Sequence, residues 1–280
     1  MTNSELMNPL KGPLLVSTPG QAPAPKNLGL PRRRASGYSI LINEIVNWIK
    51  DRVKNAGAKG IVMGLSGGID SAVVSVLAQK AVGENILCLL MPCRSIEKDI
   101  SDAYLHAKKF NLKTHFVELT KVYDTLLEIL PAGNQLAQAN LKPRLRMMTL
   151  YYFANNLNYL VAGTGNKSEI TMGYFTKYGD GGVDILPIGD LVKTKVREIA
   201  KELKILDEII TKPPSAGLWE GQTDENEMGI TYKELDEIIM AIENENDVNC
   251  DKEKIKLVKD KLQICEHKRC GPKMFIRNIN

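Results

Sequence analysis

The residues best suited to carry chemistry stand together at positions 64–71, which read Gly-Leu-Ser-Gly-Gly-Ile-Asp-Ser. Free N–H groups at the start of a helix bind anions, and adjacent glycines let the backbone approach a phosphate closely. The hydroxyls of Ser66 and Ser71 add hydrogen-bond donors. A carboxylate beside phosphates requires a cation between them, so Asp70 is a predicted Mg²⁺ ligand. This stretch therefore predicts a site for the phosphates of a nucleotide and a divalent cation.

The elements around this stretch are those that an anion site needs. Residues 61–65 form a short apolar run bounded by glycines, which is typical of a buried parallel strand, and helical spacing begins at about Asp70. The pattern lacks the lysine of a Walker A loop, and it is not Gly-x-Gly-x-x-Gly. A glycine-rich turn without a ligand is the alternative, but the strand–turn–helix context favours a phosphate site. The string Ser-Gly-Gly-Ile-Asp-Ser resembles the pyrophosphate loop of ATP pyrophosphatases, which cleave ATP between the α- and β-phosphates.

Strands and helices alternate along the first half of the chain, which predicts an α/β fold: a three-layer, Rossmann-like, doubly wound parallel sheet. In such sheets ligands bind at the carboxyl ends of the strands, near a switch in strand order. A second glycine turn, 163–166, follows the last expected strand at that edge. Pro143 should kink or divide its helix. The expected strands are 61–65, 86–91, 114–119 and 159–162; the expected helices are 38–55, 70–78, 96–110, 120–129, 134–156, 192–203, 232–242 and 251–264.

Two segments in the second half have the composition of loops that cover a site. Residues 174–187 contain too much glycine for a helix and too many polar groups for a core. We expect them to form a mobile loop, with Gly179, Gly181 and Gly182 as hinges. Residues 212–229 are polar and contain two adjacent prolines, so they are a second candidate lid.

Composition sets the N-terminal segment apart from the rest. Residues 1–35 are rich in Pro, Gly, Ser and Asn, which predicts a disordered extension or tag, with residues 36–280 as a single domain. The segment carries the net charge of +4 of the whole chain, so the remainder is near neutral and does not favour nucleic-acid binding. No apolar run reaches the ~18 residues of a membrane span. The odd count of five cysteines favours reduced thiols and a cytoplasmic location.

Five further motifs decide which enzyme of the pyrophosphate-loop class the chain resembles. They lie at 140–147, 163–169, 175–184, 212–216 and 266–269, and their order and spacing resemble ammonia-dependent NAD⁺ synthetase. The string Lys-Tyr-Gly-Asp-Gly-Gly at 177–182 is specific to that family among enzymes with this loop. The resemblance covers residues 37–277, which is nearly the whole chain outside the N-terminal segment.

The resemblance implies both a reaction and an assembly. The nicotinate carboxylate of deamido-NAD⁺ attacks the α-phosphate of ATP, an adenylate forms and pyrophosphate leaves. Ammonia then displaces AMP and yields the amide of NAD⁺, in the last step of NAD⁺ biosynthesis. The implied fold is adenine nucleotide alpha-hydrolase-like. The implied assembly is a homodimer whose interface helps form the dinucleotide site, with residues 134–156 as the candidate interface helix.

Site residues carry over to this chain by their positions in the motifs. The resemblance implies catalytic roles for Asp70, Glu169 and Lys193, with Asp70 and Glu169 binding Mg²⁺. The implied ATP contacts are Gly64, Leu65, Ser66, Gly67, Gly68, Ile69, Asp70, Ser71, Thr164, Lys193 and Ser215; the implied deamido-NAD⁺ contacts are Arg144, Lys177, Asp184, His267 and Lys268. The chemistry agrees, because displacement at an α-phosphate depends mainly on positioned cations.

Two positions depart from the family's usual motifs. Asn166 stands where the family commonly has an aspartate, which leaves the local groups that handle ammonia open. Gly217 stands where many members also have an aspartate. Serine at position 215 keeps the hydroxyl that contacts ATP.

Other functions of the same loop class remain as alternatives. They include tRNA-modifying or GMP-forming adenylating enzymes and a non-catalytic adenine-nucleotide sensor. The near-neutral charge of residues 36–280 disfavours an enzyme that acts on tRNA. The joint presence of Glu169, Lys177 and Asp184 disfavours a sensor. The chain shows no nitrilase-like or other glutaminase domain, so ammonia is the expected nitrogen donor, with a separate glutaminase as a possible source.

Overall fold

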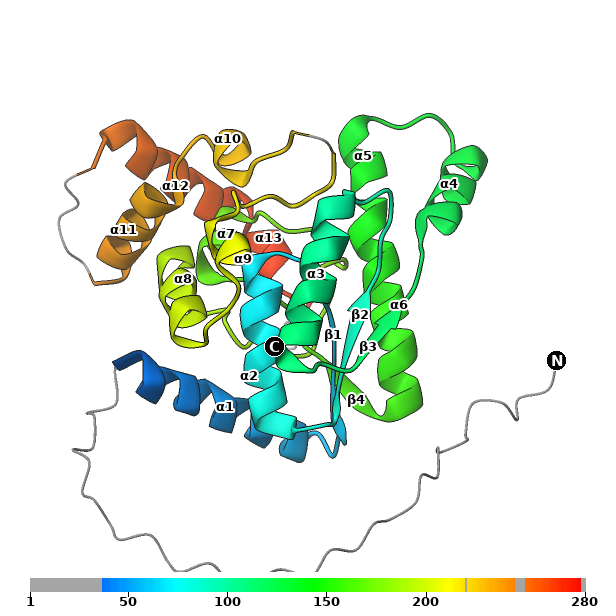
Figure 1. The fold of residues 1–280 in the computed structure, drawn as a ribbon. Coiled ribbons are helices and arrows are strands. Elements are labelled where there is room, and N and C mark those ends of the chain that lie inside the picture. The colour runs from blue at the N-terminus through cyan, green and yellow to red at the C-terminus, as the bar shows by residue number, and fades with distance from the viewer. Residues whose placement is uncertain (1–36, 220, 245–249, 278–280) are drawn as a thin grey trace, which may run out of the picture. The chain divides into compact units, whose positions relative to one another are not determined.

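A sheet of four parallel strands forms the centre of the fold, in the order β3-β2-β1-β4 (Figure 1). The strands are β1 (Gly60–Gly64), β2 (Ile86–Leu90), β3 (Thr114–Phe116) and β4 (Tyr159–Val161). The computed structural model describes residues 37–219, 221–244 and 250–277, so the predicted extension at residues 1–35 lies outside the described residues. The strand order reverses between β1 and β4, and this places the phosphate loop after β1 beside the turn after β4.

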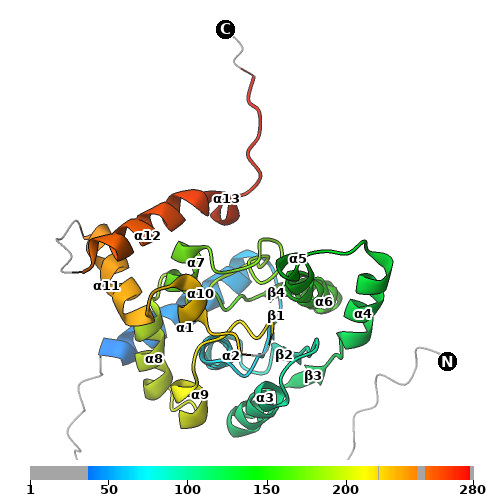
Figure 2. The ribbon, with the colours of Figure 1, turned by 90° about the horizontal axis from the view of Figure 1, so that it is seen from above.

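Helices cover both faces of the sheet. The helices of the first half are α1 (Gly37–Asn55), α2 (Ile69–Val82), α3 (Glu97–Phe110), α4 (Thr120–Ile129), α5 (Gln135–Ala139) and α6 (Leu141–Leu157). Alternate strand residues point to opposite faces. Ile61 and Met63 pack in the core with α1, α2 and α3, whereas Val62 and Leu89 pack in the core with α4 and α6. Figure 2 shows the strands between α2 and α3 on one side and α6 on the other. The predicted three-layer, doubly wound parallel sheet is therefore confirmed.

The second half of the chain forms a helical cluster at the carboxyl edge of the sheet. Its helices are α7 (Lys167–Met172), α8 (Lys193–Glu202), α9 (Asp207–Thr211), α10 (Asp224–Met228), α11 (Tyr232–Glu243), α12 (Lys252–Ile264) and α13 (Glu266–Arg269). Tyr232, Leu235 and Ile238 of α11 are fully buried and form a separate core with Met172 of α7 and Val258 of α12. This core holds α7, whereas Val196 and Ile199 of α8 pack in the sheet core with α1 and α2. Among the described residues, no helix is both long and apolar enough to cross a membrane.

Several elements differ from the expected ones. The helical stretch 134–156 is divided at Asn140 into α5 and α6. Pro143 lies in the first turn of α6, where its missing N–H would have no intrahelical partner. β3 is shorter than expected, and all three of its residues are exposed. The short helices α7, α9 and α10 were not expected, because helices of five or six residues have too few turns for a periodic pattern.

Within the described part of the chain the cysteines form no disulfide, and Cys88 and Cys93 are packing residues of the sheet. All five lie in the described residues and carry free thiols. Cys88 and Cys93 are fully buried in the two sheet cores. Burial raises the pKa of Cys88 to about 12 and also raises the pKa of Cys93. Neither thiol is therefore ionised to a useful extent near neutral pH.

His106 joins α3 to α2 inside the first sheet core. Its Nε2 lies 2.9 Å from the hydroxyl of Ser75, and both side chains are fully buried. Burial, together with the charge of Lys109, lowers the pKa of His106 from 6.5 to about 4. The imidazole is therefore neutral in the folded protein at physiological pH.

We expect this histidine to make the fold sensitive to acid. Its folded pKa lies below its unfolded pKa, so its contribution is complete above about pH 6.5 and is lost as the pH falls toward 4. The free energy of unfolding should fall by about 3 kcal/mol from this source. Urea unfolding of wild type and His106→Gln across this range isolates the effect, because other titrating groups are shared. Parallel pH curves for the two proteins would show that His106 is not the linked group.

Candidate active site

The loop between β1 and α2 is shaped by hydrogen bonds among its own serines and glycines. The Ser71 hydroxyl donates to the Gly68 carbonyl at 2.9 Å and accepts from the Ser66 N–H at 3.2 Å, and the two hydroxyl oxygens are 3.0 Å apart. Gly67 has φ +79°, and a Cβ there would collide with the Asp99 carbonyl of α3. Glycine at this position therefore lets the loop lie against α3 as well as near an anion.

The structure brings Asp70, Glu169 and Lys193 together from α2, α7 and α8. The Lys193 ammonium forms ion pairs with the Asp70 carboxylate and, at 3.2 Å, with Glu169 Oε1. Its side chain is 2% exposed, whereas the carboxylates are 16% and 17% exposed. Three residues that are distant in the sequence thus form one charged cluster at the carboxyl edge of the sheet.

Burial sets the protonation of this cluster. Burial alone would lower the pKa of Lys193, but Asp70 and Glu169 hold it above its usual value, so the ammonium stays charged. Burial raises the pKa of Glu169, Lys193 opposes the rise and Asp70 reinforces it. The lysine therefore stabilises two carboxylates that would otherwise repel each other at close range.

Asn166 is a site residue whose role the sequence did not reveal. Its Nδ2 donates to Asp70 Oδ1 at 3.0 Å, and its Oδ1 accepts from the Glu169 N–H at 3.0 Å. Glu169 Oε2 accepts from the Asn166 N–H at 3.2 Å, which completes a capping box at the start of α7. An amide here orients both carboxylates without adding a third negative charge. The Asn-x-x-Glu spacing was the available signal.

The predicted ATP contacts beyond the loop lie at its rim. Thr164 is half-buried in the turn after β4. Ser215 is exposed, and its hydroxyl accepts from the Gly217 N–H at 3.1 Å. The segment that carries Ser215 is anchored at its start, because Lys212 forms ion pairs with Asp99 and Asp102 of α3. This segment, the second candidate lid, is thereby tied to the helix on which Gly67 rests.

A second group of predicted residues joins the loop 174–187 to the C-terminal helix. The Lys177 ammonium donates to the His267 carbonyl and, at 3.2 Å, to the Cys270 carbonyl. In return, the Lys268 ammonium donates to the carbonyls of Gly173 and Phe175, at 2.7 and 2.9 Å. The His267 ring is bonded to the Ile264 carbonyl through Nδ1. Two lysines thus clasp these segments together from opposite sides.

Arg144 and Asp184 lie near an open cavity beside α6. Asp184 accepts from the Tyr151 hydroxyl at 2.9 Å and from the Val161 N–H at 2.7 Å. Arg144 and Tyr151 line the cavity, which has a volume of about 640 Å³ and is otherwise lined by Met147, Met148, Tyr152, Asn155 and Tyr178. Methionine and tyrosine side chains suit the flat rings of a nucleotide.

Arg146 has a different place from its neighbour Arg144. Its Nε donates to the Met91 carbonyl at 3.1 Å and its guanidinium bonds the Ser95 hydroxyl at 3.2 Å. The two arginines face different sides of α6, as their spacing predicts. Arg146 therefore binds the loop after β2, whereas Arg144 lines the cavity.

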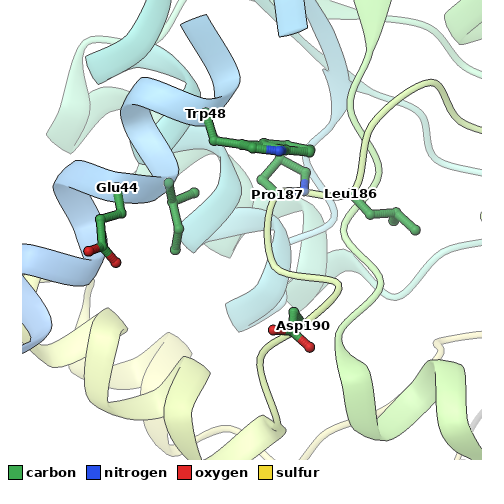
Figure 3. Close-up of a pocket in the computed structure, with 6 residues that line it drawn as sticks. Glu44, Trp48, Leu186, Pro187 and Asp190 are labelled. Carbon is green, nitrogen blue, oxygen red and sulfur yellow. The ribbon is translucent and has the colours of Figure 1, made fainter. Parts of the chain in front are cut away.

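A further cavity lies apart from these residues. It has a volume of about 400 Å³ and is lined by residues of α1 and of the segment 186–190. Figure 3 shows Trp48, Pro187 and Leu186 around it, with Glu44 and Asp190 at its rim. None of the predicted site residues lines it. The charged cluster and the cavity beside α6 are therefore the candidate site.

Comparison with known proteins shows the family to which the chain belongs. A family model described as NAD synthase matches residues 41–272. A protein of Carboxydothermus hydrogenoformans named NH(3)-dependent NAD(+) synthetase is 54% identical over 203 residues, which cover 71% of this chain and 84% of that protein. The structure of an NMN synthetase from Francisella tularensis aligns with a TM-score of 0.79 and 36% identity, over 87% of this chain and 99% of that one. An NH3-dependent NAD synthetase from Campylobacter jejuni aligns with a TM-score of 0.76 and 30% identity, over 86% and 100%.

Proposed function

The chain belongs to the NAD synthase family and catalyses the ATP-dependent amidation of deamido-NAD⁺ by ammonia to NAD⁺, and we propose that its charged cluster is the centre of that reaction. The observation that supports this proposal is the position of Lys193 between Asp70 and Glu169, beside the loop after β1. The first step is attack of the nicotinate carboxylate on the α-phosphate of ATP. Positive charge beside the phosphates stabilises the transition state of that displacement.

We propose that Mg²⁺ is the divalent cation and that Asp70 and Glu169 bind it. Both are oxygen ligands, and Mg²⁺ is commonly held by one or two carboxylates together with substrate phosphates. Within the described residues, no group of three acidic, His or Cys side chains is placed to hold a metal. Phosphate oxygens and water would therefore complete the ligand set. The bound cation would neutralise negative charge on the triphosphate.

The remaining predicted residues are proposed to hold the two nucleotides. The loop of residues 64–71 would bind ATP phosphates, with Thr164 and Ser215 at the rim. Arg144 and Asp184, beside the cavity next to α6, would bind deamido-NAD⁺ together with the clasp of Lys177, His267 and Lys268. Holding the weak carboxylate nucleophile in line contributes to the rate, in favourable cases by about 7–11 kcal/mol.

We further propose a cytoplasmic setting, with ammonia supplied from solution or by a separate glutaminase. Five free thiols are consistent with a reducing compartment.

We propose a homodimer whose interface contains the exposed apolar side chains of α6 and of the loop next to it. Met148, Tyr152 and Tyr178 are 60%, 66% and 53% exposed, and all three line the cavity that contains Arg144. A second copy packed there would cover these side chains and enclose the dinucleotide.

Met148→Glu should therefore convert a dimer to a monomer, because the new charge would lose its water at the interface. The affinity for deamido-NAD⁺ should fall while ATP binding is kept. Sedimentation velocity measures the first effect, and isothermal titration the second. Lys80→Glu, an exposed charge change on α2, is the control. A monomeric wild type would contradict this assembly.

The loop 174–187 is proposed to exclude water from the adenylate. Gly179, Gly181 and Gly182 are not among the positive-φ glycines. A Cβ on any of them would lie within 3.2 Å of a neighbouring atom, so glycine is needed there for space. A Cβ on Gly181 would lie 2.6 Å from a ring carbon of Phe175, whose carbonyl binds Lys268.

Gly181→Ala should therefore displace Phe175 and loosen the clasp. Under limiting ammonium we expect more AMP per NAD⁺ than in wild type, because the adenylate is a mixed anhydride and reacts with water that enters. Gly133→Ala is the matched control, since its Cβ would have ordinary contacts at 3.7 Å. An unchanged ratio with slower turnover would mean that the loop positions substrate without guarding the intermediate.

The experiment that tests the substrate assignment compares two acids. Purified protein is given ATP, Mg²⁺ and ammonium with either deamido-NAD⁺ or nicotinate mononucleotide, because one structural neighbour is an NMN synthetase. We expect the higher kcat/KM for deamido-NAD⁺. A clear preference for the mononucleotide would assign the chain to the other substrate.

A further inference from the structure

Asp224 is a buried carboxylate with one oxygen that has no partner. The residue is 3% exposed, and it begins α10 within the segment that forms the second candidate lid. Its Oδ2 accepts from the Tyr232 hydroxyl at 2.8 Å. Its Oδ1 is enclosed and forms no hydrogen bond. A buried carboxylate oxygen without a donor costs more than a neutral group would, so its retention calls for a ligand.

The other buried polar atoms without a hydrogen bond in the described part of the chain have local explanations. Asp124 Oδ1 lies 2.8 Å from Arg94 Nε in an ion pair. His106 Nδ1 belongs to a neutral ring that bonds Ser75 through its other nitrogen. Asp224 has no cation of its own in any ion pair that the structure describes.

One side chain separates Asp224 from the charged cluster. The Lys193 ammonium lies 5.1 Å from the centre of the Tyr232 ring, and the hydroxyl of that ring holds Asp224. Lys193 is already engaged by Asp70 and Glu169. The Tyr174 hydroxyl is also near, but its single proton is donated to Glu227 at 2.6 Å. Burial raises the pKa of Asp224, and the Tyr232 hydroxyl, Lys193 and Tyr174 oppose the rise.

These groups select a small monovalent cation. A divalent ion prefers six or more oxygen ligands, and a single free carboxylate oxygen is too few. Ammonium requires few acceptors, and aromatic rings such as Tyr174 and Tyr232 also attract cations. The reaction itself consumes nitrogen that is mostly ammonium at neutral pH.

We propose that Asp224 Oδ1 binds the ammonium substrate next to the charged cluster, with Tyr232 fixing the carboxylate. This inference rests on the proposed function, because it places the second substrate within the same site. The site would keep ammonium close while the adenylate forms and the lid excludes water. Ammonium has no lone pair, so it would pass one proton to the Asp224 carboxylate before the ammonia attacks the adenylate.

The test separates the two half-reactions. Adenylation is followed without ammonium, as exchange of labelled pyrophosphate into ATP that depends on deamido-NAD⁺. Amidation is followed as NAD⁺ formation against ammonium concentration. Asp224→Asn keeps the shape of the side chain and the Tyr232 bond. We expect its KM for ammonium to rise about tenfold or more, the effect of losing a charged hydrogen bond, with exchange kept within about twofold.

Controls distinguish this role from others. Glu208→Gln changes an exposed carboxylate of α9, and it should leave the KM for ammonium unchanged. Hydroxylamine is a neutral nucleophile, so Asp224→Asn should affect it less than ammonium. If Asp224→Asn does not fold, Tyr232→Phe frees the carboxylate and should raise the same KM by a smaller factor.

Each result that would contradict the ammonium site leads to a different conclusion. An unchanged KM for ammonium overturns the ammonium site while the proposed function stands. Loss of exchange in Asp224→Asn, or a shift in its Mg²⁺ dependence, assigns Asp224 to adenylation instead. Absence of exchange in the wild type would contradict the proposed function itself.

Discussion

Asp70→Asn should lower kcat by about 10²- to 10³-fold, the usual effect of removing one group that stabilises transition-state charge. The amide cannot replace the carboxylate as a ligand for Mg²⁺, and it also removes an ion pair of Lys193. Glu169 still pairs with the lysine, so the fold should persist. Steady-state kinetics at saturating Mg²⁺ and a thermal unfolding curve measure the two effects.

Asp190→Asn is the matched control for this prediction. Asp190 also pairs with a lysine, at 2.8 Å, but its side chain is 94% exposed. Its removal should change kcat by less than about twofold, because exposed ion pairs contribute little. Near-normal turnover of Asp70→Asn would remove Asp70 from the set of essential residues.

Lys193→Met should lower both activity and stability. The variant leaves two carboxylates close together with no cation between them, and breaking a buried ion pair by removing one partner costs about 3–5 kcal/mol. Adenylation should fall with it, since the positive charge beside the phosphates is lost. Urea unfolding gives the stability, and pyrophosphate exchange gives the adenylation rate.

The pH dependence of the stability of Lys193→Met should show why the variant is less stable. Burial raises the pKa of Glu169, and without Lys193 only the hydrogen bond from the Asn166 N–H opposes that rise. A carboxyl group whose pKa is higher in the folded state than in the unfolded state takes up its proton first in the folded state. The folded state therefore gains stability as the pH falls through the folded pKa toward the unfolded value near 4.5. The variant should therefore recover stability on acidification, and adding Glu169→Gln should restore part of it at neutral pH. An additive double variant would show that the lysine and Glu169 do not interact.

The fold was largely predictable because its signals are local. An apolar run between glycines marked β1, a second apolar run marked β2, and the helical spacing of apolar residues marked α1, α2 and α3 within a few residues. The exposed strand β3 and the five-residue helices α9 and α10 were predicted poorly or not at all. A strand without a buried face has no alternation, and one turn of helix has no period.

The site was only partly predictable, because burial and partners depend on the tertiary structure. The motifs selected Asp70, Glu169 and Lys193, and the structure brings them together. The role of Asn166 was missed: its Asn-x-x-Glu spacing indicates a helix cap, but its hydrogen bond to Asp70 on another helix has no sequence pattern. The glycines of the loop 174–187 were interpreted as hinges, and their close neighbours add a limit of space that the sequence did not indicate. Asp224 drew no attention because a partnerless oxygen is visible only in three dimensions.

The central claim is that the nicotinate carboxylate attacks the α-phosphate of ATP at this site. It is tested most directly with deamido-NAD⁺ whose carboxylate carries ¹⁸O, followed by mass spectrometry of the products after amidation. The oxygen that joins carbon to phosphorus stays with the phosphate when ammonia displaces AMP. We predict one labelled oxygen in AMP for each NAD⁺ formed, and none in pyrophosphate. Label in pyrophosphate or inorganic phosphate, or unlabelled AMP, would contradict the account.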